Sequence, residues 1–266
     1  MEAMVKWVQL SSLNVSYNSP SSYRDPLPNN HTHSFGQVLS AMTALTKPNM
    51  NGISHPYYCT SVIGGLLGFL PTQLEVLTMA DTNLNIDSSF CAVLSRMTAL
   101  RKLDMNRCCL TGRDVKLLTP ALANSHALTW LKMNAIRGLT SEVEVSALVR
   151  GLTQLQLLHL EFCGLMDHHV AEFVRSLHDH HRLTSLSLAD NILANETSRA
   201  LAAWPQLLCL EEIGLNKPDT EVYVNTSVAE EVLQQSLSFR RTVHRDKGLQ
   251  RATWDAFKRN AIRHAT

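Results

Sequence analysis

The spacing Leu-x-x-Leu-x-(Leu/Met/Val) recurs along this chain, and most copies are followed three residues later by a small, polar or thiol residue. The clearest copies start at Leu74, Leu100, Leu155 and Leu183, and looser ones start at Leu10, Leu45, Leu128 and Leu210. From Leu45 onward the copies are separated by 29, 26, 28, 27, 28 and 27 residues. A fixed period in this range is typical of a solenoid of stacked repeats, so it constrains the architecture more than any other feature of the sequence.

Each copy predicts one strand followed by one helix. The alternating Leu-x-Leu predicts a short strand whose leucines point to one side, and such a strand buries that side only by stacking in parallel with its neighbours. A helix then returns the chain to the start of the next parallel strand. We expect helices in the segments that open with a residue able to cap free N–H groups and continue with apolar spacing of three and four. These segments start at Asp87, Thr111, Thr140, Asp167 and Asn195.

The repeat motif and its period resemble those of the leucine-rich repeat proteins, specifically the ribonuclease-inhibitor-like class, over about residues 8–220. The resemblance implies an α/β solenoid, a horseshoe of about seven to eight repeats, with a parallel β-sheet on the concave face and helices on the convex face. The stretch from Leu160 to Leu188 also resembles the PRAME-type members, which act as adaptors. Because the family includes inhibitors, receptors, GTPase activators and ubiquitin-ligase adaptors, the resemblance indicates fold far more than function.

The pattern divides the chain into a solenoid at residues 1–222 and a C-terminal helical cap with a basic tail at residues 223–266. Three prolines at residues 17–33 predict a loop that lengthens the first repeat, either as a passive insertion or as a partner-binding loop. The first strand begins within about ten residues of Met1, which leaves no room for a capping element. We therefore expect either a longer product or another protein that covers this end.

The tail differs from the rest of the chain in charge. From Arg240 to the end the net charge is +6, against −5 for residues 1–239. Phosphates of RNA or an acidic protein groove could be neutralised by Arg240, Arg241, Arg245, Arg251, Lys258 and Arg259. The other interpretation is a solvated helix face that balances the acidic solenoid, since no aromatic stacking platform accompanies the charge.

The residues between the repeat leucines are expected to point outward from the concave face. The third-position column contains Ser12, Lys47, Val76, Lys102, Trp130, Leu157, Ser185 and Glu212. The fifth-position column contains Asn14, Asn49, Thr78, Asp104, Lys132, His159, Ser187 and Gly214. A register error of one residue would exchange the two faces of every strand.

These columns predict a protein-binding surface in the middle of the array. Trp130 lies beside Leu157, and Phe162 follows near the strand exit. The surface is completed by Arg101, Lys102, Lys132 and His159. An aromatic anchor among charges is typical of a binding hot spot. The alternative is that these residues pack against each other or against an edge loop.

Several residue types in the sequence are expected to be structural. Cys108, Cys163 and Asn191 hold the ninth position of their repeats, where we expect the side chain to bond backbone amides after the strand. The six cysteines form no Cys-x-x-Cys pair, which favours reduced core thiols over disulfides. The histidines of the sixth repeat fall in two groups about 15 Å apart along one predicted helix, so they predict no metal site. These histidines are His168, His169, His178, His180 and His181.

No Ser-His-Asp set, Walker loop or Gly-x-Gly-x-x-Gly is present, so we expect no catalysis and no cofactor. No apolar run approaches 18 residues, and the start lacks the layout of a secretory signal. We therefore expect no membrane contact and a cytoplasmic location, or an organelle if a leader was removed. The leading expectation is a non-catalytic protein–protein interaction scaffold, a subunit or adaptor in a larger complex with one or several protein partners. The alternative is an RNA-associated structural subunit of a ribonucleoprotein assembly, docked through the basic tail.

Overall fold

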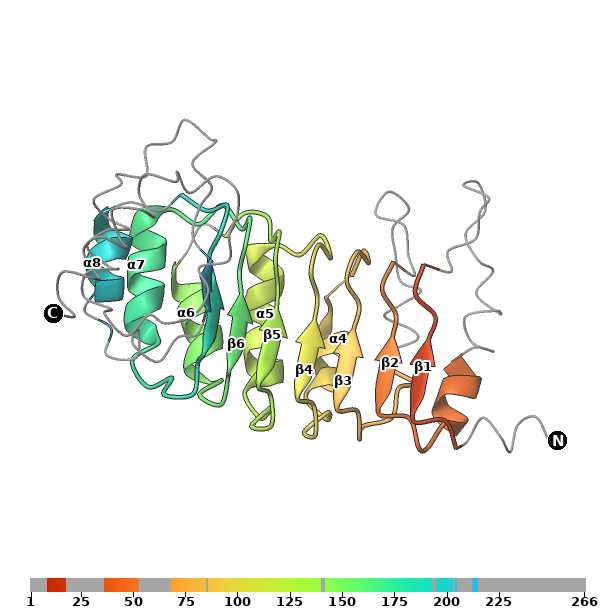
Figure 1. Cartoon of the computed structure of the whole chain (residues 1–266). Coiled ribbons are helices and arrows are strands. Elements are labelled where there is room, and N and C mark those ends of the chain that lie inside the picture. Colours follow the sequence, from red (N-terminus) through yellow and green to blue (C-terminus); the bar gives the residue numbers. More distant parts are fainter. Residues whose placement is uncertain are drawn as a thin grey trace, which may run out of the picture.

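The computed structural model describes residues 9–17, 36–52, 68–84, 86–139, 142–192, 195–202, 204 and 212–214. In these residues eight parallel strands form one sheet in sequence order (Figure 1). The strands are β1 (Ser12–Asn14), β2 (Lys47–Asn49), β3 (Val76–Thr78), β4 (Lys102–Asp104), β5 (Trp130–Lys132), β6 (Leu157–His159), β7 (Ser185–Ser187) and β8 (Glu212–Gly214). The predicted solenoid is thereby confirmed, with one strand for each copy of the motif.

Helices cover one face of this sheet. They are α4 (Ser88–Leu94), α5 (Gly112–Leu122), α6 (Glu142–Arg150), α7 (Asp167–Ser176) and α8 (Asn195–Ala202). Each packs against the next one along the array, and in Figure 1 α4, α5 and α6 lie behind the strands while α7 and α8 are seen at the left end. Residues 36–41 are also helical. We call the face of the sheet opposite the helices the outer sheet face.

The pairing register agrees with the predicted columns. Lys102 pairs with Trp130, Trp130 with Leu157, and Leu157 with Ser185. In the other column Asp104 pairs with Lys132, and Lys132 with His159. The alternate residues of each strand point toward the helices, so the assignment of inward and outward positions is correct.

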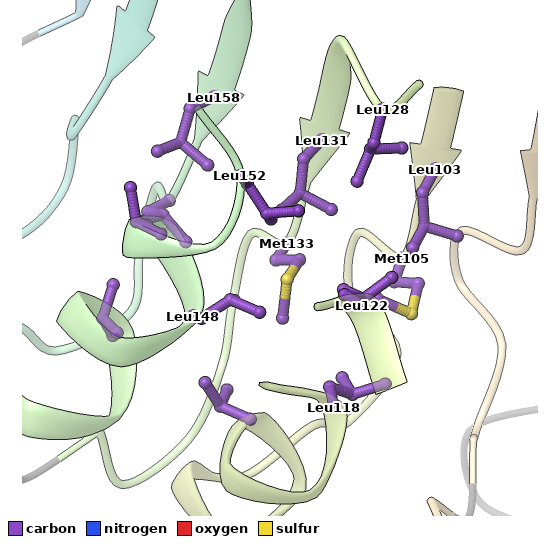
Figure 2. Packing of buried hydrophobic residues seen from close by; sticks show 14 of the residues in the cluster. Leu103, Met105, Leu118, Leu122, Leu128, Leu131, Met133, Leu148, Leu152 and Leu158 are labelled. Carbon is purple, nitrogen blue, oxygen red and sulfur yellow. The ribbon is translucent and has the colours of Figure 1, made fainter. Parts of the chain in front are cut away.

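The core lies between the sheet and the helices. Figure 2 shows leucines and methionines of neighbouring repeats pointing into one continuous interior. Leu103, Leu131 and Leu158, the central residues of β4, β5 and β6, are fully buried there. Full burial of one such side chain stabilises the fold by about 1.5–3 kcal/mol, and stacking places an equivalent leucine in each successive repeat.

The predicted helix caps are confirmed at two helices and wrong at a third. The Asp87 carboxylate accepts from the Phe90 N–H at 2.8 Å and caps α4. At α5 the Asp114 carboxylate accepts from the Thr111 N–H at 2.8 Å, as expected of a capping box. Asp167 was expected to cap α7, but the N-cap residue is Met166.

Asp167 instead caps the next helix of the array. Its two carboxylate oxygens accept from the backbone N–H groups of Glu196 and Thr197 in the first turn of α8, at 2.8 and 2.9 Å. The sequence pattern identified a capping residue correctly but assigned it to the wrong helix. The reason is that stacking brings neighbouring helix N-termini within reach of one another.

A turn after each of the first seven strands repeats one backbone conformation. Seven residues adopt left-handed geometry there, with φ between +54° and +61°. They are Tyr17, Gly52, Asp81, Arg107, Ala135, Phe162 and Asp190. Each of the first six donates its N–H to a carbonyl of the following repeat at 2.7–3.0 Å. We call this row of residues the rim; it lies at the C-terminal edge of the sheet.

Candidate functional site

The predicted protein-binding surface is centred on Trp130, which is partly exposed on the outer sheet face. Its strand is fixed by two bonds from the Thr129 and Trp130 N–H groups to the Arg101 carbonyl. The Lys132 ammonium lies 4.7 Å from the centroid of the Trp130 ring. A cation over an indole face at this distance is attracted to the ring, so the two side chains stabilise each other's position.

The neighbouring strands supply apolar and charged groups around this pair. Leu157 lies beside Trp130 and is also partly exposed, while Lys102 on the other side is exposed. Lys132 lies between Asp104 and His159 in the fifth-position column. The sheet thus brings together five of the seven predicted residues: Lys102, Trp130, Lys132, Leu157 and His159.

Two polar groups on this surface are partly desolvated. Burial raises the pKa of the Asp104 carboxyl, and the Asn106 N–H and the Lys132 charge act in the opposite direction. The His159 imidazole has one nitrogen 3.6 Å from a Glu161 carboxylate oxygen and the other 3.4 Å from the Ser185 hydroxyl. These contacts hold His159 close to the sheet, beside the Trp130–Lys132 pair.

The two remaining predicted residues lie at opposite edges of the sheet. Arg101 precedes β4 and is exposed at the N-terminal edge of the strands. Phe162 follows β6 by three residues, belongs to the rim and is 70% exposed. The sequence placed Phe162 near the strand exit correctly, but the turn carries its side chain to the rim, a different surface.

The rim has a polar end that the sequence analysis did not identify. The Tyr17 hydroxyl donates to an Asp81 oxygen at 3.2 Å, and the Arg107 guanidinium pairs with the other Asp81 oxygen at 2.8 Å. The Tyr17 ring passes over Gly52, where an added Cβ would lie 2.4 Å from a ring carbon. The repeat spacing could have predicted a column of left-handed positions. It could not have predicted which side chains of neighbouring repeats contact each other there.

Exposed apolar side chains lie near the rim in the sixth and seventh repeats, and we call this group, which includes Phe162 of the rim, its apolar end. Next to Phe162, Met166 is 48% exposed and Ile192 is 42% exposed. Met166 and Ile192 were missed because each is an isolated apolar residue outside the strand and helix patterns. The signal was available: both occupy repeat positions where polar residues are preferred.

The ninth repeat position is structural, but its chemistry differs from the prediction at the cysteines. The Asn191 amide oxygen accepts from the Cys163 and Leu165 N–H groups at 3.0 and 3.1 Å, as expected. The thiols of Cys108 and Cys163 instead donate to carbonyl oxygens, those of Met79 at 2.9 Å and Met133 at 3.5 Å. A thiol is a better donor than acceptor here because a carbonyl lies opposite it.

Burial makes these two thiols poor nucleophiles. It raises the pKa of Cys163 to about 11 and raises that of Cys108 further still. Cys91, Cys108, Cys109 and Cys163 are free thiols. A thiolate is the reactive form of cysteine, so neither buried thiol is suited to nucleophilic chemistry near neutral pH.

His180 is buried near the end of the sixth repeat. It is 1% exposed, and its Nε2 lies 3.0 Å from the Val149 carbonyl oxygen. Its Nδ1 has no hydrogen-bond partner within the described part of the chain. Among the described residues no three His, Cys, Asp or Glu side chains are arranged to hold a metal ion.

The predicted nucleic-acid or acidic-partner residues of the tail lie outside the described residues, as do the C-terminal cap and the proline-rich loop. Of the helices that the structure describes, none has the length and apolar character needed to cross a membrane.

No family model matches this chain. The chain is similar to a solved internalin (inlF) from Listeria monocytogenes, with a TM-score of 0.52 and 21% identity. That match covers 81% of this chain but 58% of the internalin chain. It is also similar to the leucine-rich repeat-containing protein LegL7 from Legionella pneumophila, with a TM-score of 0.51 and 14% identity, over 98% of this chain and 94% of that one. The chain therefore has the leucine-rich repeat fold, and nothing in these likenesses supports the narrower resemblance to PRAME-type members.

Proposed function

We propose that this protein is a non-catalytic interaction scaffold, and that the outer sheet face around Trp130 binds a protein partner within a larger complex. The observation that supports this most is the Trp130–Lys132 pair at the middle of the array. A large aromatic ring that stays partly exposed, held in place by its neighbour, loses little side-chain entropy when a partner covers it.

The surface suggests the chemistry of that partner. Trp130 and Leu157 offer adjacent apolar area, and the ammonium groups of Lys102 and Lys132 lie beside it. A partner segment with one apolar side chain flanked by carboxylates would satisfy both features. Charged groups at the edge would speed association, while the burial of Trp130 would account for most of the affinity.

The test compares the full-length protein with Trp130→Ala as baits for affinity purification from the native source, with mass spectrometry of the recovered proteins. Lys116→Ala is the matched control, because Lys116 is an exposed residue of α5 on the opposite side of the repeat. We expect Trp130→Ala to reduce recovery of a specific partner by about tenfold or more, and Lys116→Ala to leave it unchanged. Equal recovery with both variants, at equal melting temperature, would exclude the outer sheet face.

A second proposed function rests on the sequence of the tail. The +6 charge from Arg240 onward favours an RNA-associated role, in which affinity falls steeply as salt concentration rises. Charge reversal at Arg240, Arg241 and Arg245 in the full chain should abolish RNA retention and leave partner recovery through Trp130 intact. RNA retention that is insensitive to salt and to these substitutions would eliminate this role.

A further inference from the structure

We propose that the apolar end of the rim, formed by Phe162, Met166 and Ile192, is a second binding surface, and that it takes a segment of a protein partner with apolar anchors and basic flanks. This surface lies at the C-terminal edge of the strands, separate from the face around Trp130. It is therefore independent of the function proposed above. We call this surface the rim patch.

The three residues of the rim patch come from two segments that run side by side. The Phe162 N–H donates to the Ala189 carbonyl at 3.0 Å, and the Ile192 N–H donates to the Leu165 carbonyl at 2.8 Å. Between these two bonds the Asn191 side chain accepts from Cys163 and Leu165. The backbone beneath the patch is thus fixed before any partner arrives, which lowers the entropic cost of binding.

Gly164 leaves space between the first two anchors. It is left-handed, with φ +66°, and a Cβ built on it would meet no atom within 4 Å. Phe162 and Met166 lie on either side of it along the chain, and both are exposed. A partner side chain placed over Gly164 would contact apolar groups on both sides.

Local preference does not explain Met166. It is the N-cap residue of α7, at a position where Ser, Thr, Asp and Asn are strongly preferred. The equivalent positions are Asp87 at α4 and Thr111 at α5, and both are residues of the preferred kind. The His169 Nδ1 accepts from the Met166 N–H at 3.3 Å, but methionine is still a residue type disfavoured at an N-cap. It exposes a flexible apolar side chain of the type enriched at interfaces.

Phe162 is equally unusual for its place in the rim. A bulky residue in left-handed geometry is uncommon, and other rim positions carry Gly52, Ala135 and Asp190. The other aromatic residue of the rim, Tyr17, is stabilised by its bond to Asp81. Phe162 has no hydroxyl and its side chain remains 70% exposed. Phe162 and Met166 both depart from the residue types preferred at their positions, and both expose apolar side chains to solvent. Departures of this kind tend to mark functional sites.

Charge decides which partner the patch fits. Glu161 precedes Phe162, Asp190 is the next rim residue, and the Glu196 N–H bonds the carboxylate of Asp167 beside Met166. Residues 161–174 and 183–192 contain no Lys or Arg. In the preceding repeat the exposed Arg137 holds the position equivalent to Gly164, so carboxylates still outnumber cations around the patch. An apolar patch bordered by carboxylates selects a segment that combines apolar anchors with basic residues, and disfavours an acidic one.

The test uses the full-length protein and a fluorescein-labelled amphipathic peptide of leucine and lysine as the probe, followed by fluorescence anisotropy. Two control peptides replace either the leucines by serine or the lysines by glutamate. We expect the leucine–lysine probe to bind at least about tenfold more tightly than either control. Equal binding of the serine control would show attraction to charge alone and would overturn the proposal.

The decisive variant combines Phe162→Asp with Met166→Thr. Aspartate already occupies the rim at Asp81 and Asp190, and threonine is the cap of α5, so both substitutions suit the backbone. The added carboxylate would strengthen a purely electrostatic interaction with the probe. The proposal requires the opposite, a loss of about tenfold or more, while Trp130→Ala leaves probe binding unchanged.

Two further outcomes would also overturn the proposal. Unchanged or tighter probe binding by the double variant would place the probe elsewhere on the protein. Self-association of the natural protein in sedimentation analysis, abolished by the double variant, would identify a second copy of this chain as the occupant. Met166→Thr alone keeps the test valid if the double variant fails to fold, because this substitution is expected to raise the melting temperature while weakening the probe.

Discussion

The fourth and sixth repeats, residues 100–127 and 155–182, have equal length, so every residue of the fourth has a counterpart 55 positions later. Their strands, turns and helices superpose in sequence without a gap. At three positions, however, the fourth repeat has a residue suited to its local environment and the sixth does not. Thr111 corresponds to Met166, Arg107 to Phe162, and Ser125 to His180.

The difference shows which features the fold requires and which it only tolerates. Arg107 pairs with Asp81, and Thr111 bonds the carboxylate of Asp114. The sixth repeat keeps the same backbone, with Phe162 at φ +54° against +55° for Arg107, although Phe162 cannot form the ion pair and the Met166 N–H bonds the His169 Nδ1 at a longer distance of 3.3 Å. The leucine core and the parallel register therefore determine the backbone, and the turn and cap residues are free to serve another purpose.

The largest expected loss of stability concerns the contact between the turn of each of these repeats and the repeat that follows it. Asn191 supports the turn of the sixth repeat: its amide nitrogen donates to the Leu160 and Leu188 carbonyls at 2.7 and 2.9 Å, and its oxygen accepts from Cys163 and Leu165. Asn191→Ala leaves these buried groups unpaired and should lower the free energy of unfolding by about 3 kcal/mol or more, measured by urea denaturation.

The control for Asn191 is the same position of the fifth repeat, which faces the fourth. Ile136 is buried there and has no side-chain hydrogen bond to offer, while the backbone bond is the same in both places: the Arg137 N–H bonds the Leu110 carbonyl as the Ile192 N–H bonds that of Leu165. Ile136→Val should cost about 0.5–1.5 kcal/mol. If Asn191→Ala costs no more than Ile136→Val, the hydrogen bonds of the Asn191 side chain do not stabilise the turn of the sixth repeat.

The next effect depends on pH and separates His180 from Ser125. Burial lowers the pKa of His180, although the Val149 carbonyl and the Asp179 charge act in the opposite direction. The unfolded chain takes up a proton near pH 6.5, where the folded chain does not, so the unfolded state binds more protons in this window. The free energy of unfolding should therefore fall, by at most about 2 kcal/mol, as the pH decreases from 7 to 5.

His180→Leu is the variant that isolates this contribution, because Leu152 occupies the same position in the fifth repeat. Removal of the buried imidazole should flatten the pH dependence of denaturation between pH 5 and 7. An unchanged slope in the variant would show that His180 is not the source of the dependence.

Exchanging the N-cap residues of α5 and α7 should change the free energy of unfolding by a smaller amount, with opposite signs for the two variants. Met166→Thr provides α7 with the cap that α5 already has, and should raise the free energy of unfolding by about 1 kcal/mol. Thr111→Met removes the hydroxyl at 2.7 Å from Asp114 and should lower it by a similar amount. Thermal melts of both variants measure the exchange. Two changes of the same sign would mean that side-chain packing, and not capping, controls these positions.

The sequence predicted the repeat architecture because the period and the leucine spacing are properties of the chain itself. The register of all eight strands followed from the motif, and so did the pairing of Trp130 with Leu157. Interactions between repeats could not be predicted in the same way. Whether Asp167 caps α7 or α8, and whether Tyr17 reaches Asp81, depends on distances across the stack that no single repeat contains.

The candidate surface could be predicted only where its residues lie on the repeated strands. The two columns placed Lys102, Trp130, Lys132, Leu157 and His159 together correctly, since they lie on strands with period two. Phe162 lies beyond the strand, in a turn whose left-handed residue changes the direction of the chain. Met166 and Ile192 each depart from the polar preference of their repeat positions, but only the bond from the Ile192 N–H to the Leu165 carbonyl shows that their two segments are neighbours.

The smallest expected effect concerns the polar end of the rim. The Arg107–Asp81 pair has a short distance of 2.8 Å, but the Arg107 side chain is 72% exposed. An exposed ion pair of this kind contributes at most about 0.5 kcal/mol and is screened by salt, so Arg107→Ala should barely alter the urea midpoint and should do so less at high ionic strength. A loss above about 1 kcal/mol would mean that the polar end stabilises the fold in a way that the apolar end does not. The left-handed turn would then depend on its side chains, and the exposure of Phe162 in the same turn would no longer distinguish a binding residue from a weakly stabilised repeat.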